Sequence, residues 1–186
     1  HGGGAVLGVG AAENYNYDTL SLEELDKAFQ NTALVADGKR LEWIGFDACL
    51  MAMIEVADVL SGYADYMIAS EETEIGEGWD YSCLKTLSDG EHFHGSQATK
   101  EIVEAYHTYY ETNYKYTPDY ALACLDLSRT KEVVSGWESL IDAAAKELHE
   151  GGYSKIAKLR DQTKTFGKVS SSGFYDTVDL YDLAGK

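Results

Sequence analysis

A histidine followed by three glycines, and a cysteine that follows an apolar stretch, are the residues of this sequence best suited to chemistry. The sequence begins with His1-Gly2-Gly3-Gly4, and Asp47-Ala48-Cys49 follows the apolar stretch 41–46. Consecutive glycines let a ligand approach the backbone closely. Lipases and esterases use such a loop to hold an oxyanion, but they also need a Gly-x-Ser-x-Gly nucleophile elbow. The sequence contains no such elbow, which disfavours an esterase.

The surroundings of Cys49 predict a reactive thiol. Stretch 41–46 is typical of a buried strand, and the segment after Cys49 is rich in strong helix formers. At the N-terminus of the expected helix, the macrodipole would stabilise a thiolate. An inert buried cysteine is the alternative, but Asp47 at the strand end would be costly to bury without a partner, which favours a site.

The elements that must position these residues alternate between helices and strands. Ser21 and Glu24 form a capping box that predicts a helix over 21–35. Composition and periodicity then predict the following elements: strand 41–46, a helix from 49, strand 63–69, helix 97–112, strand 120–127 and a helix from 128. This order is typical of an α/β fold with a mainly parallel sheet and helices on both faces, and ligands bind at the carboxyl ends of its strands. We expect a single domain over 1–186.

Composition limits the classes of partner. The net charge is −17 over 186 residues, and no cluster of lysine and arginine is present, which disfavours nucleic acid. An acidic surface attracts cationic substrates or metal ions, although it can equally be a solvated surface without a ligand. No apolar stretch reaches about 18 residues, so the sequence predicts no membrane span. The three cysteines show no Cys-x-x-Cys spacing, so neither a disulfide framework nor a structural zinc site is indicated.

The order and spacing of the two motifs resemble a peptidase family. His1 precedes Cys49 by 48 positions, close to the spacing of histidine and cysteine in caspases. Together, "HGGG", "IGFDACLMAMIEVA" and "YMIASEETEIGEGWDYS" resemble the clostripain family of bacterial cysteine peptidases, in the clan of caspases, legumains and gingipains. The resemblance covers nearly the whole sequence. It implies a caspase-like α/β/α sandwich whose N-terminal strands precede His1, so we expect the chain to be part of a longer enzyme.

The resemblance also implies roles for individual residues. Cys49 would be the nucleophile and His1 the acid that protonates the leaving amine of a peptide bond cleaved after arginine or lysine. The backbone N–H groups of Gly2 and Cys49 would hold the oxyanion.

A basic residue entering the first pocket needs acidic partners. Asp47 is the expected first acid. For the second, the candidates in order are Glu77, Asp80 and Glu74. Ser70 and Glu71 are expected to shape the pocket, with an exposed polar loop as the alternative.

Cofactors, partners and location follow from the same resemblance. No cofactor is expected to be required, although some family members need calcium. The expected partners are proteins or peptides with arginine or lysine before the scissile bond, and the chain's own propeptide or another processed chain. A secreted, cell-surface or periplasmic bacterial zymogen is expected. The alternative is a non-catalytic caspase-like module that binds basic peptides at a cell surface, against which the intact histidine and cysteine argue.

Overall fold

The computed structural model describes residues 1–85, 94–114, 120–167 and 177–186. The chain forms two compact units, His1–Thr130 and Lys131–Lys186. The expectation of a single domain over 1–186 stays a prediction.

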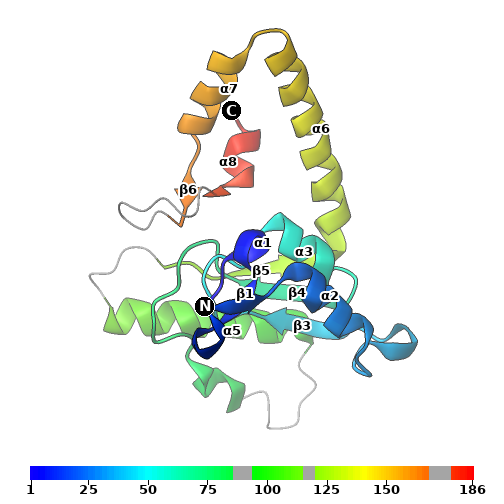
Figure 1. Cartoon of the computed structure of the whole chain (residues 1–186). Helices are drawn as coiled ribbons and strands as arrows, with labels where there is room; N and C mark the ends of the chain where they lie inside the picture. The colour runs from blue at the N-terminus through cyan, green and yellow to red at the C-terminus, as the bar shows by residue number, and fades with distance from the viewer. Residues whose placement is uncertain (86–93, 115–119, 168–176) are drawn as a thin grey trace. The chain divides into compact units, whose positions relative to one another are not determined.

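A three-stranded sheet lies at the centre of the first unit (Figure 1). Its strands are β3 (Leu41–Gly45), β4 (Ala64–Ala69) and β5 (Ala123–Asp126), and β4 is the middle strand. β3 and β4 are parallel, whereas β4 and β5 are antiparallel. The predicted α/β class is confirmed, and the sheet is mixed rather than mainly parallel.

The direction of α5 (Gly95–Asn113) explains the reversed strand. The helix begins beside Glu42, near the start of β3, where a Cβ on Gly95 would lie 2.9 Å from the Glu42 side chain. Near its other end, the Tyr110 hydroxyl reaches the loop that follows β4. The next strand therefore starts at the edge where β3 and β4 end. The alternation of helices and strands does not reveal the direction of β5. The long connection between β4 and α5 brings the chain back to the start of β3, and nothing in the alternation indicates this.

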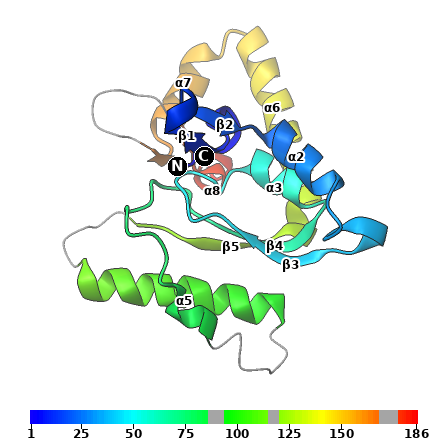
Figure 2. The ribbon, with the colours of Figure 1, turned by 60° about the horizontal axis from the view of Figure 1, so that its bottom comes forward.

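Helices cover both faces of the sheet (Figure 2). α2 (Leu22–Gln30) and α3 (Ile54–Leu60) lie on one side and α5 on the other. Adjacent residues of β4 pack on opposite faces of the sheet. Met67 belongs to the apolar cluster under α3, and Ile68 packs with the tyrosines of α5. Both are fully buried, as expected for the middle strand of a covered sheet.

Two helix boundaries differ from the prediction. The capping box of Ser21 and Glu24 is present, but α2 ends at Gln30, because the side chain of Asn31 caps the carbonyl of Lys27 at 2.6 Å. The helix expected from residue 49 begins only at Ile54. Leu50 has a φ of 59°, which is incompatible with a right-handed helix.

The remaining elements are short, apart from one long helix. The N-terminal segment contains α1 (Gly4–Leu7), the antiparallel pair β1 (Val9–Ala12) and β2 (Asp18–Leu20), and the 3-10 turn η1 (Glu13–Tyr15). Further 3-10 turns are η2 (Ala36–Gly38), η3 (Tyr81–Cys83) and η4 (Leu127–Arg129). From Thr130 the chain forms α6 (Thr130–His149), α7 (Tyr153–Asp161), the antiparallel pair β6 (Thr165–Phe166) and β7 (Thr177–Val178), and α8 (Leu180–Ala184). Among the helices that the structure describes, none is both long and apolar enough to span a membrane.

Candidate active site

The histidine motif and the cysteine motif lie against each other. A Cβ on Gly2 would be 2.3 Å from the backbone oxygen of Cys49, so the two backbones are in direct contact at this point. Gly2 is held there by a bridge to Val9, in which the His1 carbonyl accepts the N–H of Gly10 at 2.8 Å. The His1 side chain is exposed and Cys49 is half-buried.

Cys49 lies in a turn rather than at a helix N-terminus, which corrects the prediction. The turn is held by the loop that follows β4. The backbone N–H of Glu74 donates to the Cys49 sulfur at 3.2 Å, and the N–H of Leu50 donates to the carbonyl of Glu72 at 3.1 Å. The positive φ of the fully buried Leu50 is a strained conformation of the kind found at functional sites.

Two backbone donors at this junction are uncommitted. Within the part of the chain that the structure describes, neither the N–H of Gly2 nor that of Cys49 makes a hydrogen bond. In the bridge between Gly2 and Val9, the hydrogen bonds are made by the flanking residues, which leaves the N–H of Gly2 free. Uncommitted backbone N–H groups beside a nucleophile can stabilise a developing oxyanion.

Asp47 is exposed and hydrogen-bonded, so it does not stand as an unpaired carboxylate at the strand end. Its Oδ2 accepts the Tyr81 hydroxyl at 2.6 Å and the backbone N–H of Trp79 at 3.2 Å. Gly78 makes this approach possible: its φ is +68°, and a Cβ there would lie 2.7 Å from Oδ2. The Tyr110 hydroxyl donates to the Gly78 carbonyl at 2.8 Å, so α5 supports the loop.

Glu74 is the acidic side chain of this loop that is turned inward. Both of its carboxyl oxygens are buried and make no hydrogen bond within the described residues, although Asp47, the Trp79 indole and the backbone N–H of Ala48 lie close enough to affect its titration. Burial raises the pKa of Glu74 to about 8, with a further contribution from Asp47. Trp79 Nε1 and the Tyr106 hydroxyl are also buried without a partner in the described residues.

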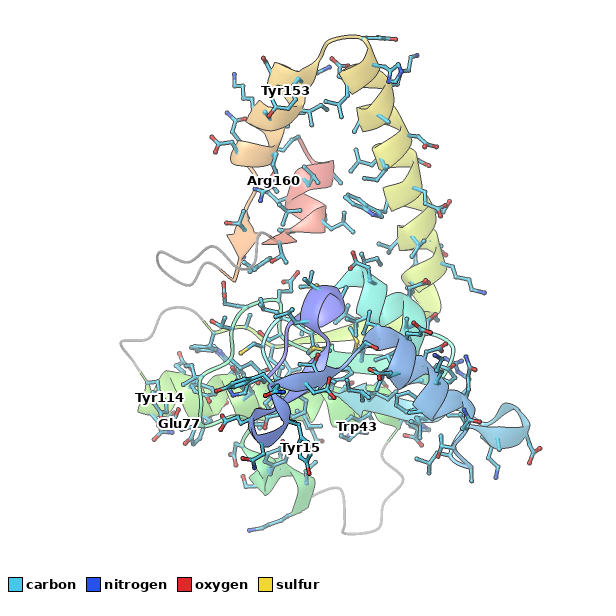
Figure 3. All side chains as sticks on the ribbon, in the orientation of Figure 1. Tyr15, Trp43, Glu77, Tyr114, Tyr153 and Arg160 are labelled. Atoms are coloured by element: carbon cyan, nitrogen blue, oxygen red, sulfur yellow. The ribbon has the colours of Figure 1, made fainter. Side chains whose placement is uncertain are left out.

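The other two acidic candidates have different neighbours. Glu77 is exposed and lies toward Tyr114, whose pKa it raises through a hydrogen bond (Figure 3). Asp80 is the N-cap of η3 and accepts the N–H of Ser82 at 3.0 Å, and this bond lowers the pKa of Asp80.

Ser70 and Glu71 occupy different environments. The side chain of Ser70 is fully buried, accepts the N–H of Glu72 at 3.0 Å and donates to its carbonyl at 2.9 Å. Glu71 is exposed and lines a cavity of about 340 Å³ with residues that include His107 and Tyr120. Ser70 therefore fixes the turn after β4, and the expectation that Ser70 and Glu71 shape the pocket stays a prediction.

Sequence reasoning missed three aromatic residues of this site: Trp79, Tyr81 and Tyr106. Trp79 and Tyr81 stand within the "GEGWDYS" segment that carried the family resemblance, but nothing in their spacing indicated hydrogen bonds to Asp47. Tyr106 stands within the predicted helix 97–112. Its hydroxyl carries no sequence signal of proximity to Glu74.

A metal site is not evident in the geometry. No group of three or more histidine, cysteine, aspartate or glutamate side chains that could hold a metal ion occurs within residues 1–85, 94–114, 120–167 and 177–186. A need for calcium stays a prediction.

Comparison with known proteins places this arrangement in a family. The model of the clostripain family matches residues 4–185. An inactive zymogen C11 protease from Parabacteroides distasonis aligns with a TM-score of 0.57 at 18% identity, over 100% of this chain and 46% of that one. A clostripain from Bacteroides thetaiotaomicron ATCC 29148, in complex with the peptide inhibitor BTN-VLTK-AOMK, aligns with a TM-score of 0.52 at 21% identity, over 84% of this chain and 56% of that one.

A third solved structure is a secreted C11 cysteine protease from Bacteroides thetaiotaomicron, iotapain. It aligns with a TM-score of 0.50 at 27% identity, over 64% of this chain and 30% of that one. The chain thus spans between 30% and 56% of the length of these three proteins. No curated protein matches the sequence. Because the family model covers almost all of the residues, the chain belongs to the clostripain family.

Proposed function

We propose that the protein is a cysteine endopeptidase that cleaves peptide bonds after arginine or lysine. The observation that carries this proposal is the junction of Gly2 and Cys49, where two uncommitted backbone N–H groups lie beside a half-buried thiol. Membership of the clostripain family supports the same chemistry.

In the proposed reaction, the sulfur of Cys49 attacks the scissile carbonyl and forms a thioester. His1 gives a proton to the leaving amine, and the N–H groups of Gly2 and Cys49 hold the oxyanion. Water then hydrolyses the thioester and regenerates the thiol. The hydrogen bond from the N–H of Glu74 keeps the sulfur in place before the substrate binds.

The proposed preference for a basic residue rests on Asp47. Asp47 is an exposed residue, and it lies two residues before the nucleophile. The peptide inhibitor bound by the Bacteroides thetaiotaomicron clostripain, BTN-VLTK-AOMK, has a peptide part that ends in lysine. We propose protein or peptide substrates of the same kind, including the chain's own propeptide, and an extracellular or cell-surface location like that of the secreted relative.

Covalent labelling tests the proposal. A lysyl or arginyl chloromethylketone should label Cys49 in the full-length protein, and Cys49→Ala should abolish both labelling and the cleavage of a fluorogenic lysine or arginine substrate. His1→Ala should retain the thiol but lose turnover. If the Cys49→Ala variant cleaves as fast as the wild type, the assignment is wrong. Binding of the basic peptide with no turnover by the wild type would instead favour a non-catalytic peptide-binding module.

A further inference from the structure

Asp47 and Glu74 form a carboxyl pair without a cation. Neither residue takes part in an ion pair within the described chain. Asp47 receives two hydrogen bonds, from the Tyr81 hydroxyl and the N–H of Trp79. Glu74 receives no hydrogen bond that meets ordinary geometry, although its oxygens are buried. Burial therefore favours a neutral Glu74.

The other titratable groups around Glu74 that the structure describes add no positive charge. They are Tyr106 and Tyr110 on α5, Tyr81 on η3, and Cys49, whose sulfur accepts the Glu74 N–H. Burial raises the pKa of each of these three tyrosines, and the charge of Glu74 adds to the rise, so all three are neutral near pH 7. Where no cation is near, each of two neighbouring carboxyl groups disfavours the charge of the other.

We propose that Asp47 and Glu74 share one proton in the empty first pocket, and that the basic side chain of the substrate displaces this proton as it binds. This inference rests on the peptidase function proposed above. It makes Glu74, rather than Glu77 or Asp80, the second acid of the pocket. Before binding the pair carries one negative charge. Afterwards both carboxylates are ionised, the substrate cation faces them, and the proton has left to the solvent.

The buried polar atoms around Glu74 fit this exchange. The Trp79 indole N–H can donate to the Glu74 carboxylate once it ionises, and the Tyr106 hydroxyl can accept from a substrate ammonium or guanidinium group. Both atoms lack partners in the described chain, which is costly unless a bound group satisfies them. Burial and the charge of Asp47 place the pKa of Glu74 at about 8, so the proton is present at neutral pH.

Calorimetry on the full-length protein tests the exchange. Cys49→Ala removes the nucleophile and keeps the pocket. The probe is a blocked peptide with one basic residue, lysine or arginine, whichever the active enzyme cleaves faster. Titrations at pH 7 in two buffers of different ionisation enthalpy give the number of protons released per bound peptide. We expect about one proton in the Cys49→Ala protein, because a group with a pKa near 8 is still mostly protonated at pH 7.

Two further variants assign the proton. Adding Glu74→Gln should abolish the release, whereas the matched variant Glu77→Gln should retain it. In the enzyme with Cys49 intact, KM should fall about tenfold per pH unit between pH 6 and 7. The KM of Glu74→Gln should lack this slope. The kcat of the wild type and the kcat of Glu74→Gln should both lack it. Glutamine is a neutral isostere of the protonated glutamate, so this variant should fold.

The outcomes separate this inference from the proposed function. Binding without proton release, release that persists in Glu74→Gln, or release that is lost in Glu77→Gln would overturn the shared proton and leave the peptidase intact. A full-length protein that neither binds nor cleaves a basic peptide would overturn the proposed function and the inference with it.

Discussion

Replacement of Gly2 by alanine should separate the histidine motif from the cysteine motif. The added Cβ would lie 2.3 Å from the Cys49 carbonyl oxygen, 3.0 Å from the Ala48 Cβ and 3.1 Å from Met51 Cγ. The nearest obstacle is backbone, and it belongs to the turn that the loop after β4 holds in place. Met51 is fully buried, so the neighbouring side chain has little room to move.

The size of the effect follows from the contact. Ordinary van der Waals contacts of a Cβ begin at 3.4 Å, so the two backbones must move apart by about 1 Å. A misplacement of this size costs roughly 100-fold in rate, which is about 2.7 kcal/mol of transition-state stabilisation. The strain of the extra methyl group should also lower the free energy of unfolding by about 1–3 kcal/mol.

The assay is kcat/KM for a lysine or arginine substrate, measured beside urea unfolding of the same full-length protein. Gly76→Ala is the matched control, because a Cβ on Gly76 would meet no atom within 4 Å and its φ is not positive. We expect the control to keep both its rate and its stability. If Gly2→Ala kept the wild-type kcat/KM, the close approach of the two segments would not matter for catalysis, and the oxyanion role of the Gly2 N–H would be refuted.

Three further changes test other parts of the argument. Glu74→Gln should remove a loss of stability that the wild type suffers as pH rises. In the wild type, native Glu74 keeps a proton that the unfolded chain loses above the ordinary pKa of 4.5, so the free energy of unfolding falls by up to about 1.4 kcal/mol per pH unit. This fall should end near the native pKa of about 8. Urea unfolding between pH 5.5 and 7.5 measures the slope, and equal slopes in both proteins would contradict the raised pKa. Met67→Ala should lower the free energy of unfolding by about 2–5 kcal/mol in the same experiment, because Met67 is fully buried in the middle strand. Lys100→Ala, on the exposed face of α5, should change it by less than about 0.5 kcal/mol. Similar values for the two variants would place Met67 outside the core. Gly136→Ala should stabilise α6 by about 1 kcal/mol, since Gly136 is exposed inside the helix with no atom within 4 Å of the added Cβ, and a fall in Tm would show that the glycine has another role.

The class of fold was predictable because its signals are local. The capping box of Ser21 and Glu24, the apolar run of β3 and the buried run of β4 all depend on residues within one element. The antiparallel direction of β5 was not predictable, since it depends on where α5 begins and ends in space. The start of α3 was missed for a different reason. Strong helix formers continue from residue 50, but tertiary hydrogen bonds from the loop after β4 hold Leu50 at a positive φ.

In the site, too, the types of the residues were predictable from the sequence, whereas their arrangement in space was not. The spacing of His1 and Cys49 pointed to a common site because both motifs have recognisable chemistry, and the contact of Gly2 with the Cys49 carbonyl brings their backbones together. The second acid was harder to predict, since Glu74, Glu77 and Asp80 stand within seven positions of one loop and have the same chemistry. The burial of its carboxyl group distinguishes Glu74 from the other two, and tyrosines of α5, about 30 positions further along the chain, lie close enough to be affected by its charge. A helix that contributes no predicted catalytic residue therefore forms part of the surroundings of Glu74.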